Sequence, residues 1–156
     1  MRVESSITLP VDSRRAWELM TDWERQPEWM RDADRVEVLT PHREGSGVRI
    51  AVKTSVLGIP MFTEVLETIT WEPFQLIVVA HSGFVSGVGI WRFEPDAGRT
   101  RVTWTEDLSM PIPLLGRIAL AVYRPLMRRL MAGSLESFRR RATSSPRSRP
   151  RRRATS

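Results

Sequence analysis

The order of hydrophobic and polar positions divides the chain into one strand, a short helical region, six further strands and a long final helix. The N-terminal residues alternate between two faces, one of which carries Val3 and Leu9, as in a half-buried strand. A first short helix is expected after a cap at Asp12 or Ser13, and a second within residues 24–30. The strand-like runs cover residues 2–9, 35–39, 48–53, 61–71, 75–81, 84–94 and 101–108.

The clearest two-residue alternation lies in the third strand. Val48, Ile50 and Val52 face one way, while Arg49 and Lys53 face the other. We therefore predict that the three apolar side chains of this strand face the final helix and that the two basic ones face water.

The strand over residues 61–71 leaves its inner face open, because both faces mix polar and apolar side chains. One face carries Thr63, Val65, Glu67, Ile69 and Trp71, and the other carries Phe62, Glu64, Leu66, Thr68 and Thr70. The alternation alone does not choose between the two faces.

The final helix is expected over residues 114–141, because its apolar residues recur every three or four positions and form one face. At 1.5 Å per residue it spans on the order of 40 Å, so it needs a broad apolar partner, and the preceding strands supply the only candidate. Pro125 is expected to kink the helix or split it near Tyr123. The apolar face consists of Leu115, Ile118, Val122, Leu126, Leu130, Met131, Leu135 and Phe138.

Several short motifs mark a resemblance to a known family. They are AWELMTD at residues 16–22 with Trp29 seven positions on, the turn at residues 71–73, GRTRVT at residues 98–103 and SLESF at residues 134–138. Over residues 1–141 the chain resembles the START-like (SRPBCC, helix-grip) superfamily, in its polyketide cyclase/dehydrase and lipid-transport branch. The resemblance implies an α+β helix-grip fold. In it a seven-stranded antiparallel sheet wraps around a long C-terminal helix, two short helices follow the first strand, and a cavity lies between sheet and helix.

Composition narrows the possible chemistry. The chain has 156 residues, enough for one domain with a real core, and it lacks cysteine, which excludes disulfides and thiolate metal sites. Only His42 and His81 are histidines, so we expect no metal site, and we expect no cofactor. The N-terminus lacks the apolar core of a signal peptide, and no long uncharged apolar window occurs, so we expect a cytoplasmic protein.

The positive charge of the chain is concentrated at its C-terminal end. Residues 139–156 contain eight arginines and no acidic residue, and removing them from the net charge of +6 leaves −2 for residues 1–138. We therefore expect a START-like ligand-binding domain over residues 1–141 and a disordered Arg/Ser/Pro-rich tail over residues 142–156. Such a tail is a candidate for contact with an anionic membrane or a nucleic acid, and the alternative is an unstructured, solubilising end.

Two carboxylates are candidate catalytic groups, because they lie on strand faces that also carry apolar residues. Glu106 shares a face with Trp104, and Glu67 shares one with Val65. If these faces point into the cavity, desolvation raises the pKa of each carboxyl group and makes it a usable acid or base. The alternative is that each lies in water or pairs with an arginine.

His81 and Tyr123 are the other catalytic candidates. His81 ends an apolar strand, but the sequence identifies no partner carboxylate, so we favour a hydrogen-bonded core or rim residue. Tyr123, the only tyrosine, lies beside Pro125 on the final helix, where its hydroxyl either reaches the cavity or meets water.

Three functions are compatible with these features. We favour a protein that binds a hydrophobic small molecule such as a lipid, isoprenoid or polyketide, because no catalytic constellation stands out. The first alternative is an aromatase/cyclase-type enzyme, which requires two inward carboxyl or imidazole groups close together. The second is a membrane-associated interaction protein with a closed cavity. The expected ligand-binding residues are Trp29, Val52, Trp91, Trp104, Glu106, Tyr123, Met127 and Met131.

Overall fold

The computed structural model describes residues 1–83, 85–111 and 113–144. It contains the predicted order of elements, with the boundaries shifted by a few residues. In chain order these are β1 (Arg2–Leu9), α1 (Ser13–Thr21), the 3-10 helix η1 (Trp23–Glu28), β2 (Ala33–Val38), β3 (Arg49–Val56), β4 (Ile59–Glu72), β5 (Leu76–Ser82), β6 (Ser86–Asp96), β7 (Arg99–Ser109) and α2 (Pro113–Thr143).

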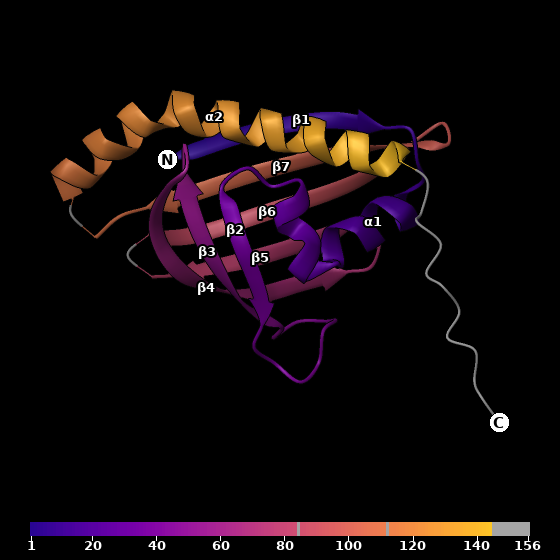
Figure 1. The fold of residues 1–156 in the computed structure, drawn as a ribbon, viewed down its shortest axis with the longest axis horizontal. Coiled ribbons are helices and arrows are strands. Elements are labelled where there is room, and N and C mark those ends of the chain that lie inside the picture. Colours follow the sequence, from indigo (N-terminus) through magenta and orange to yellow (C-terminus); the bar gives the residue numbers. More distant parts are fainter. Residues whose placement is uncertain (84, 112, 145–156) are drawn as a thin grey trace.

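The seven strands form one antiparallel sheet with the order β1-β7-β6-β5-β4-β3-β2. The sheet curls, and α2 lies along β1 on its concave side, while α1 and η1 lie near the C-terminal end of α2 (Figure 1). The predicted α+β helix-grip fold, with two short helices after the first strand, is therefore confirmed.

The predicted register of β3 is also confirmed. Val48, Ile50 and Val52 are buried, whereas Arg49 and Lys53 are exposed. The inner face of β3 points toward the core. Helix α2 lies along β1 and covers the same core from there.

Strand β4 has a shift of register between Thr68 and Thr70, where it pairs with β5. The shift moves Trp71 onto the core side, where its ring lies 4.9 Å from the Trp17 ring in an edge-to-face arrangement. Strict alternation would place Trp71 on the same face as Glu67, which is exposed. A β-bulge of this kind moves every later residue to the opposite face of the sheet. The inward direction of Trp71 therefore does not mean that Thr63, Val65 and Glu67 also point inward.

Helix α2 follows the first of the two alternatives predicted for Pro125, a bend without a break, and differs from its prediction at its C-terminal end. It continues through Pro125 as one helix, and its ribbon bends instead of breaking (Figure 1). It also extends to Thr143, and Ala142 is buried in the core. The domain boundary predicted at residue 141 therefore falls inside the helix. The predicted disorder of the tail concerns residues 145–156, which lie outside the described residues.

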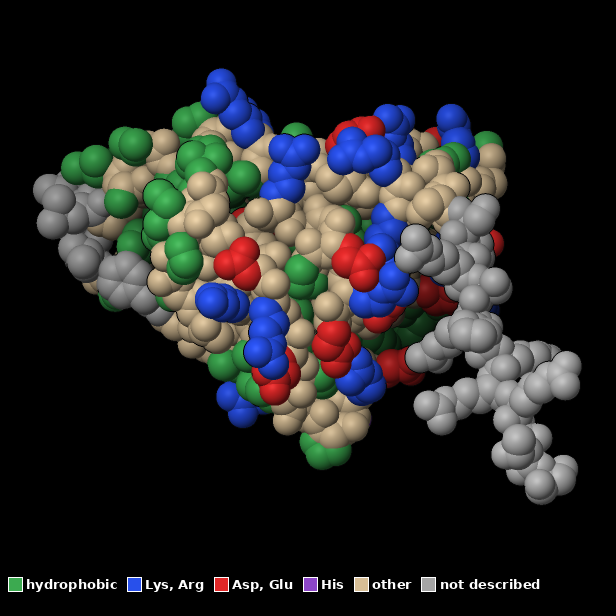
Figure 2. Space-filling view, viewed as in Figure 1, with side chains coloured by type: hydrophobic (Ala, Val, Ile, Leu, Met, Phe, Trp, Pro, Cys, Tyr) green, Lys and Arg blue, Asp and Glu red, His purple; other side chains and the backbone are tan. Residues whose placement is uncertain are grey.

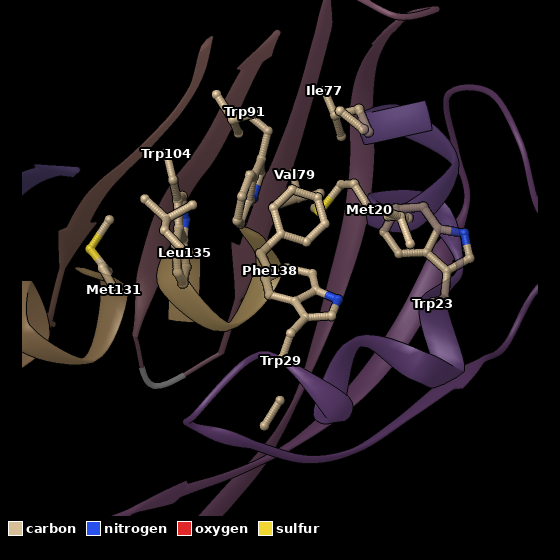
Figure 3. Close-up of a cluster of buried hydrophobic side chains, with 14 of the residues drawn as sticks. Met20, Trp23, Trp29, Ile77, Val79, Trp91, Trp104, Met131, Leu135 and Phe138 are labelled. Carbon is tan, nitrogen blue, oxygen red and sulfur yellow. The ribbon is translucent and has the colours of Figure 1, made fainter. Parts of the chain in front are cut away.

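The C-terminal half of α2 provides its main hydrophobic contact with the sheet. Met131, Leu135 and Phe138 are each at most 1% exposed, and the Phe138 ring lies 4.6 Å from the ring of Trp29. Figure 3 shows these side chains together with Trp91 and Trp104 in one cluster. This cluster fixes the helix on the sheet.

We predict that Phe138→Ala lowers the free energy of unfolding by about 3–5 kcal/mol, because it leaves a large cavity beside Trp29. Urea denaturation monitored by circular dichroism measures the loss. Val122→Ala on the same helix is the matched control, because Val122 is 73% exposed and its truncation should change stability by about 0.5 kcal/mol at most. Equal effects of the two substitutions would contradict the packing described here.

Candidate functional site

A cavity of about 350 Å³ lies between the inner face of the sheet, the segment leading into β2 and the N-terminal half of α2. Most of its lining is apolar and includes Ile50 and Val52 of β3, Trp91 of β6 and Leu120 of α2. The polar side chains in the lining are Gln26, Asp32, Thr54, Glu64, His81, Glu106 and the hydroxyl-bearing Tyr123.

His81 lies between two carboxylates in the wall of this cavity. Its Nδ1 is 3.0 Å from Glu64 Oε2 on β4, and its Nε2 is 3.2 Å from Glu106 Oε2 on β7. The second contact lacks hydrogen-bond geometry, so it is a contact between charges. All three side chains are at most 12% exposed. A buried imidazole is thus placed where two carboxylates compensate its charge.

Gly89 allows Glu106 to reach His81 across an intervening strand. In the sheet, β6 separates β5, which carries His81, from β7, which carries Glu106, and Gly89 pairs directly with Glu106. A Cβ atom at position 89 would lie 2.9 Å from Glu106 Oε1, so any side chain there would displace the carboxylate. Trp104 then fixes the carboxylate, because its Nε1 donates a 2.6 Å hydrogen bond to Glu106 Oε1.

The two carboxylates hold His81 in its charged form. Burial by itself lowers the pKa of His81, but the contacts with Glu106 and Glu64 outweigh burial and raise this pKa to about 10. His81 is therefore an imidazolium at neutral pH, with its Nδ1–H donating to Glu64 and its Nε2 in charge contact with Glu106.

Asp32 is a further acidic group in the cavity wall. Burial, followed by the negative charges of Glu106 and Glu64, raises the pKa of Asp32 to about 6. Its Oδ1 atom is buried and has no hydrogen-bond partner among the described residues. Asp32 therefore changes charge close to neutral pH and keeps an acceptor atom available in the cavity wall.

The segment that carries Asp32 is held at both sides by hydrogen bonds. The Arg31 backbone N–H donates to Ser134 Oγ of α2 at 2.9 Å, and the Ser55 N–H of β3 donates to the Asp32 carbonyl at 2.9 Å. Gly133 permits the close approach, because a Cβ atom there would lie 2.7 Å from the Arg31 guanidinium group. The SLESF motif, which begins at Ser134, thus has a structural role in positioning Asp32.

Tyr123 lines the cavity from α2. Burial raises the pKa of Tyr123, and the negative charge of Asp32 raises it further. The phenol is therefore protonated at neutral pH, and its hydroxyl is a donor on the helix side of the cavity.

The cavity brings together most of the residues expected from the sequence but not all of them. Trp29 and Met131 are buried in the core beside it and are not part of its lining. Glu67 is about half exposed and lies 3.9 Å from Arg49, so of the two alternatives it follows the one in which it meets water near an arginine and not the one in which it points into the cavity. The expected residues that do line the cavity are Val52, His81, Trp91, Trp104, Glu106, Tyr123 and Met127.

Sequence analysis missed Asp32 and Glu64 as site residues. Glu64 lies on the other face of β4 from Glu67, and that face is the inner one in the first half of the strand. The alternation of Glu64 with Leu66 was a usable signal, but both faces of this strand mix polar and apolar side chains, so the alternation alone did not identify the inner face. Asp32 lies between η1 and β2, where no periodicity exists to assign a side-chain direction.

Exposed apolar side chains surround one end of the cavity. Leu57 and Ile59 of the β3–β4 hairpin are 75% and 65% exposed, and Met61 and Phe62 are exposed as well as part of the lining. Figure 2 shows hydrophobic side chains gathered at the end of the molecule where α2 begins. The β3–β4 hairpin beside the cavity therefore presents exposed apolar side chains, two of which also line the cavity.

No cluster of three or more His, Cys, Asp or Glu side chains within residues 1–83, 85–111 and 113–144 could hold a metal ion. In the same part of the chain, none of the helices has the length and apolar character needed to span a bilayer.

This chain is similar to a known protein family and to several solved structures. The model of a family described as "Polyketide cyclase / dehydrase and lipid transport" matches residues 1–143. The comparison with curated proteins finds no match.

Solved structures share the fold at low sequence identity. TTHA0849 from Thermus thermophilus has a TM-score of 0.77 at 21% identity, over 91% of this chain and 97% of that chain. The Zhui aromatase/cyclase from Streptomyces has a TM-score of 0.68 at 22% identity, over 90% and 94% of the two chains. The di-domain aromatase/cyclase StfQ of the steffimycin pathway has a TM-score of 0.71 at 15% identity, over 90% of this chain and 50% of that chain.

We predict that Asp32→Asn stabilises the protein at pH 8 by about 1–3 kcal/mol and has little effect at pH 4. Folded Asp32 keeps its proton up to about pH 6, whereas the unfolded side chain loses it near 3.8. The folded state thus binds more protons between these values, and stability falls as the pH rises through them. Urea denaturation at both pH values measures the difference.

Glu67→Gln is the control for this pH dependence, because Glu67 is exposed and lies outside the cavity. It should give similar small changes at both pH values. An Asp32→Asn effect of the same size at pH 4 and pH 8 would show that the charge of Asp32 is not destabilising.

Proposed function

The chain belongs to the polyketide cyclase/dehydrase and lipid transport family, and we propose that it binds one hydrophobic small molecule in the cavity between the sheet and α2. The observation that carries the proposal is the cavity of about 350 Å³ with its mainly apolar lining. Members of this family bind hydrophobic ligands or act as polyketide aromatase/cyclases. A lipid, an isoprenoid or a polyketide-like molecule is the class of ligand that such a lining accepts.

The size of the cavity sets the scale of the expected affinity. Ligand sites commonly enclose on the order of 300–1,000 Å³, and this cavity lies at the lower end of that range. Burying about 300 Å² of apolar ligand surface at roughly 25 cal/mol per Å² contributes several kcal/mol before the entropy cost of binding. This supports micromolar affinity for a purely apolar ligand, and polar anchors in the wall are needed for tighter binding.

We predict that Leu120→Trp raises the dissociation constant for pyrene at least tenfold, because the larger side chain fills the cavity from α2. Leu120 lines the cavity, whereas Met131, which was expected among the ligand-binding residues, does not. Fluorescence titration of the protein with pyrene measures the dissociation constant.

Val122→Trp is the matched control, because it adds the same fluorophore to the same helix at a position that is 73% exposed. Its affinity for pyrene should equal that of the parent. If Leu120→Trp binds as well as Val122→Trp while remaining folded, the ligand site is not this cavity.

An aromatase/cyclase-type reaction is the second candidate function. The observation in its favour is that three carboxyl groups and one imidazolium line an apolar cavity, and that Asp32 ionises near neutral pH. In this reaction the Asp32 carboxylate takes a proton from the carbon between two carbonyl groups of the substrate. The Tyr123 hydroxyl donates a hydrogen bond to the enolate oxygen that forms.

We predict that the protein accelerates hydrogen–deuterium exchange at the methylene carbon of an aryl β-diketone and that Asp32→Asn lowers this rate at least tenfold. Proton NMR in deuterated buffer follows the exchange without requiring the natural substrate. Glu67→Gln should retain the parent rate. An equal rate for Asp32→Asn and the parent would exclude Asp32 as the base.

The membrane-associated interaction protein is a third candidate function and stays a prediction. Contact of the Arg-rich tail with an anionic surface stays a prediction, because most of this tail lies outside the described residues.

A further inference from the structure

We propose that the cavity selects hydrophobic ligands that carry a hydrogen-bond donor, such as a hydroxyl, a phenol or a protonated amine, and that it rejects carboxylates. Asp32 and Glu106 are the receiving groups. The inference rests on the proposed function, since it concerns which ligands the same cavity accepts.

The first observation is that two acceptor atoms in the cavity wall lack hydrogen-bond partners. Glu106 is only 5% exposed and its Oε2 atom is unpartnered, apart from the 3.2 Å charge contact with His81. Asp32 Oδ1 is likewise buried without a partner among the described residues. Leaving a buried acceptor unpaired costs free energy, and a ligand that brings a donor to either atom recovers it.

The second observation is that most donors in the cavity wall are already engaged within the protein. Gln26 Nε2 donates to the Met20 carbonyl, Thr54 Oγ1 to the Phe62 carbonyl and Trp104 Nε1 to Glu106. His81 Nδ1 faces Glu64, whereas His81 Nε2, which is in charge contact with Glu106, and the Tyr123 hydroxyl are the donors that remain for a ligand. A carboxylate contains only acceptors, so it would find few donors here unless it broke one of these contacts.

The third observation is the charge of the wall. Asp32, Glu64 and Glu106 are acidic, His81 is the basic group, and none of the described lining residues is arginine or lysine. Acidic side chains therefore outnumber basic ones in the lining by three to one, and Asp32 gains its negative charge as the pH rises through about 6. A further anion inside this apolar enclosure would be repelled with little screening by water, whereas an ammonium group would be attracted.

The test uses four pyrene derivatives that share one hydrophobic body: 1-methylpyrene, 1-pyrenemethanol, 1-pyrenemethylamine and 1-pyrenecarboxylic acid. Fluorescence titration of the full chain at pH 7.5 gives the four dissociation constants. We expect the alcohol and the ammonium compound to bind at least tenfold more tightly than the methyl compound. We expect the carboxylate to bind at least tenfold more weakly than the methyl compound.

The variants Asp32→Asn and Glu106→Gln assign the selection to these two carboxyl groups. In each variant, the ratio of the dissociation constant of the methyl compound to that of the ammonium compound should fall at least threefold. The ratio of the dissociation constant of the carboxylate to that of the methyl compound should also fall at least threefold. Glu67→Gln should leave the order of the four constants unchanged. The series measured on the parent chain decides the proposal even if Glu106→Gln fails to fold.

The outcomes separate this inference from the proposed function. If the methyl compound binds and all four constants agree within threefold, or if the carboxylate binds most tightly, donor selection is wrong while ligand binding stands. If none of the four compounds binds, the proposed function fails and the inference with it.

Discussion

The packing of α2 against the sheet along only part of its length is the constraint on which the site depends. Met131, Leu135 and Phe138 of its C-terminal half are buried against the sheet and the first helices, while Leu120, Tyr123 and Met127 line the cavity. A helix packed over its whole length would fill the space between sheet and helix. The division of α2 into a packed half and a covering half therefore creates the cavity without weakening the contact that holds the fold together.

The same division determines where buried charge is tolerated. The ion contacts of His81 with Glu64 and Glu106 lie in the cavity wall, and the tightly packed cluster around Phe138 consists of apolar and aromatic side chains. Taking two carboxylates and an imidazolium out of water is costly, and their mutual attraction offsets that cost only in good geometry. Gly89 and Trp104 supply this geometry for Glu106, one by leaving room for the carboxylate and the other by donating to it.

The fold could be predicted from the sequence where strands alternate regularly and the helix keeps its period. Val48, Ile50 and Val52 show this, because their inward direction follows from their spacing alone. The site could be predicted only in part, because its charged groups come from separate strands and a loop. Glu64, His81 and Glu106 meet through strand pairing and the gap at Gly89, neither of which is visible in a local pattern. The inner face of β4 could not be chosen from the sequence, because the β-bulge near Thr68 places Glu64 and Trp71, which strict alternation assigns to opposite faces, on the same side of the sheet.

The protonation of His81 decides what chemistry this cavity can support. With its pKa raised to about 10 and a carboxylate on each side, the ring holds both protons at neutral pH and has no lone pair with which to accept another. His81 therefore cannot act as a general base near neutral pH, although a lone histidine in an apolar cavity would suggest that role. Its positive charge instead lies between the two carboxylates of Glu64 and Glu106, whose negative charges add to burial in raising the pKa of Asp32. A group that accepts a hydrogen bond or a proton from a ligand must consequently be a carboxyl group and not His81. This holds whether the cavity only binds the ligand or also removes one of its protons.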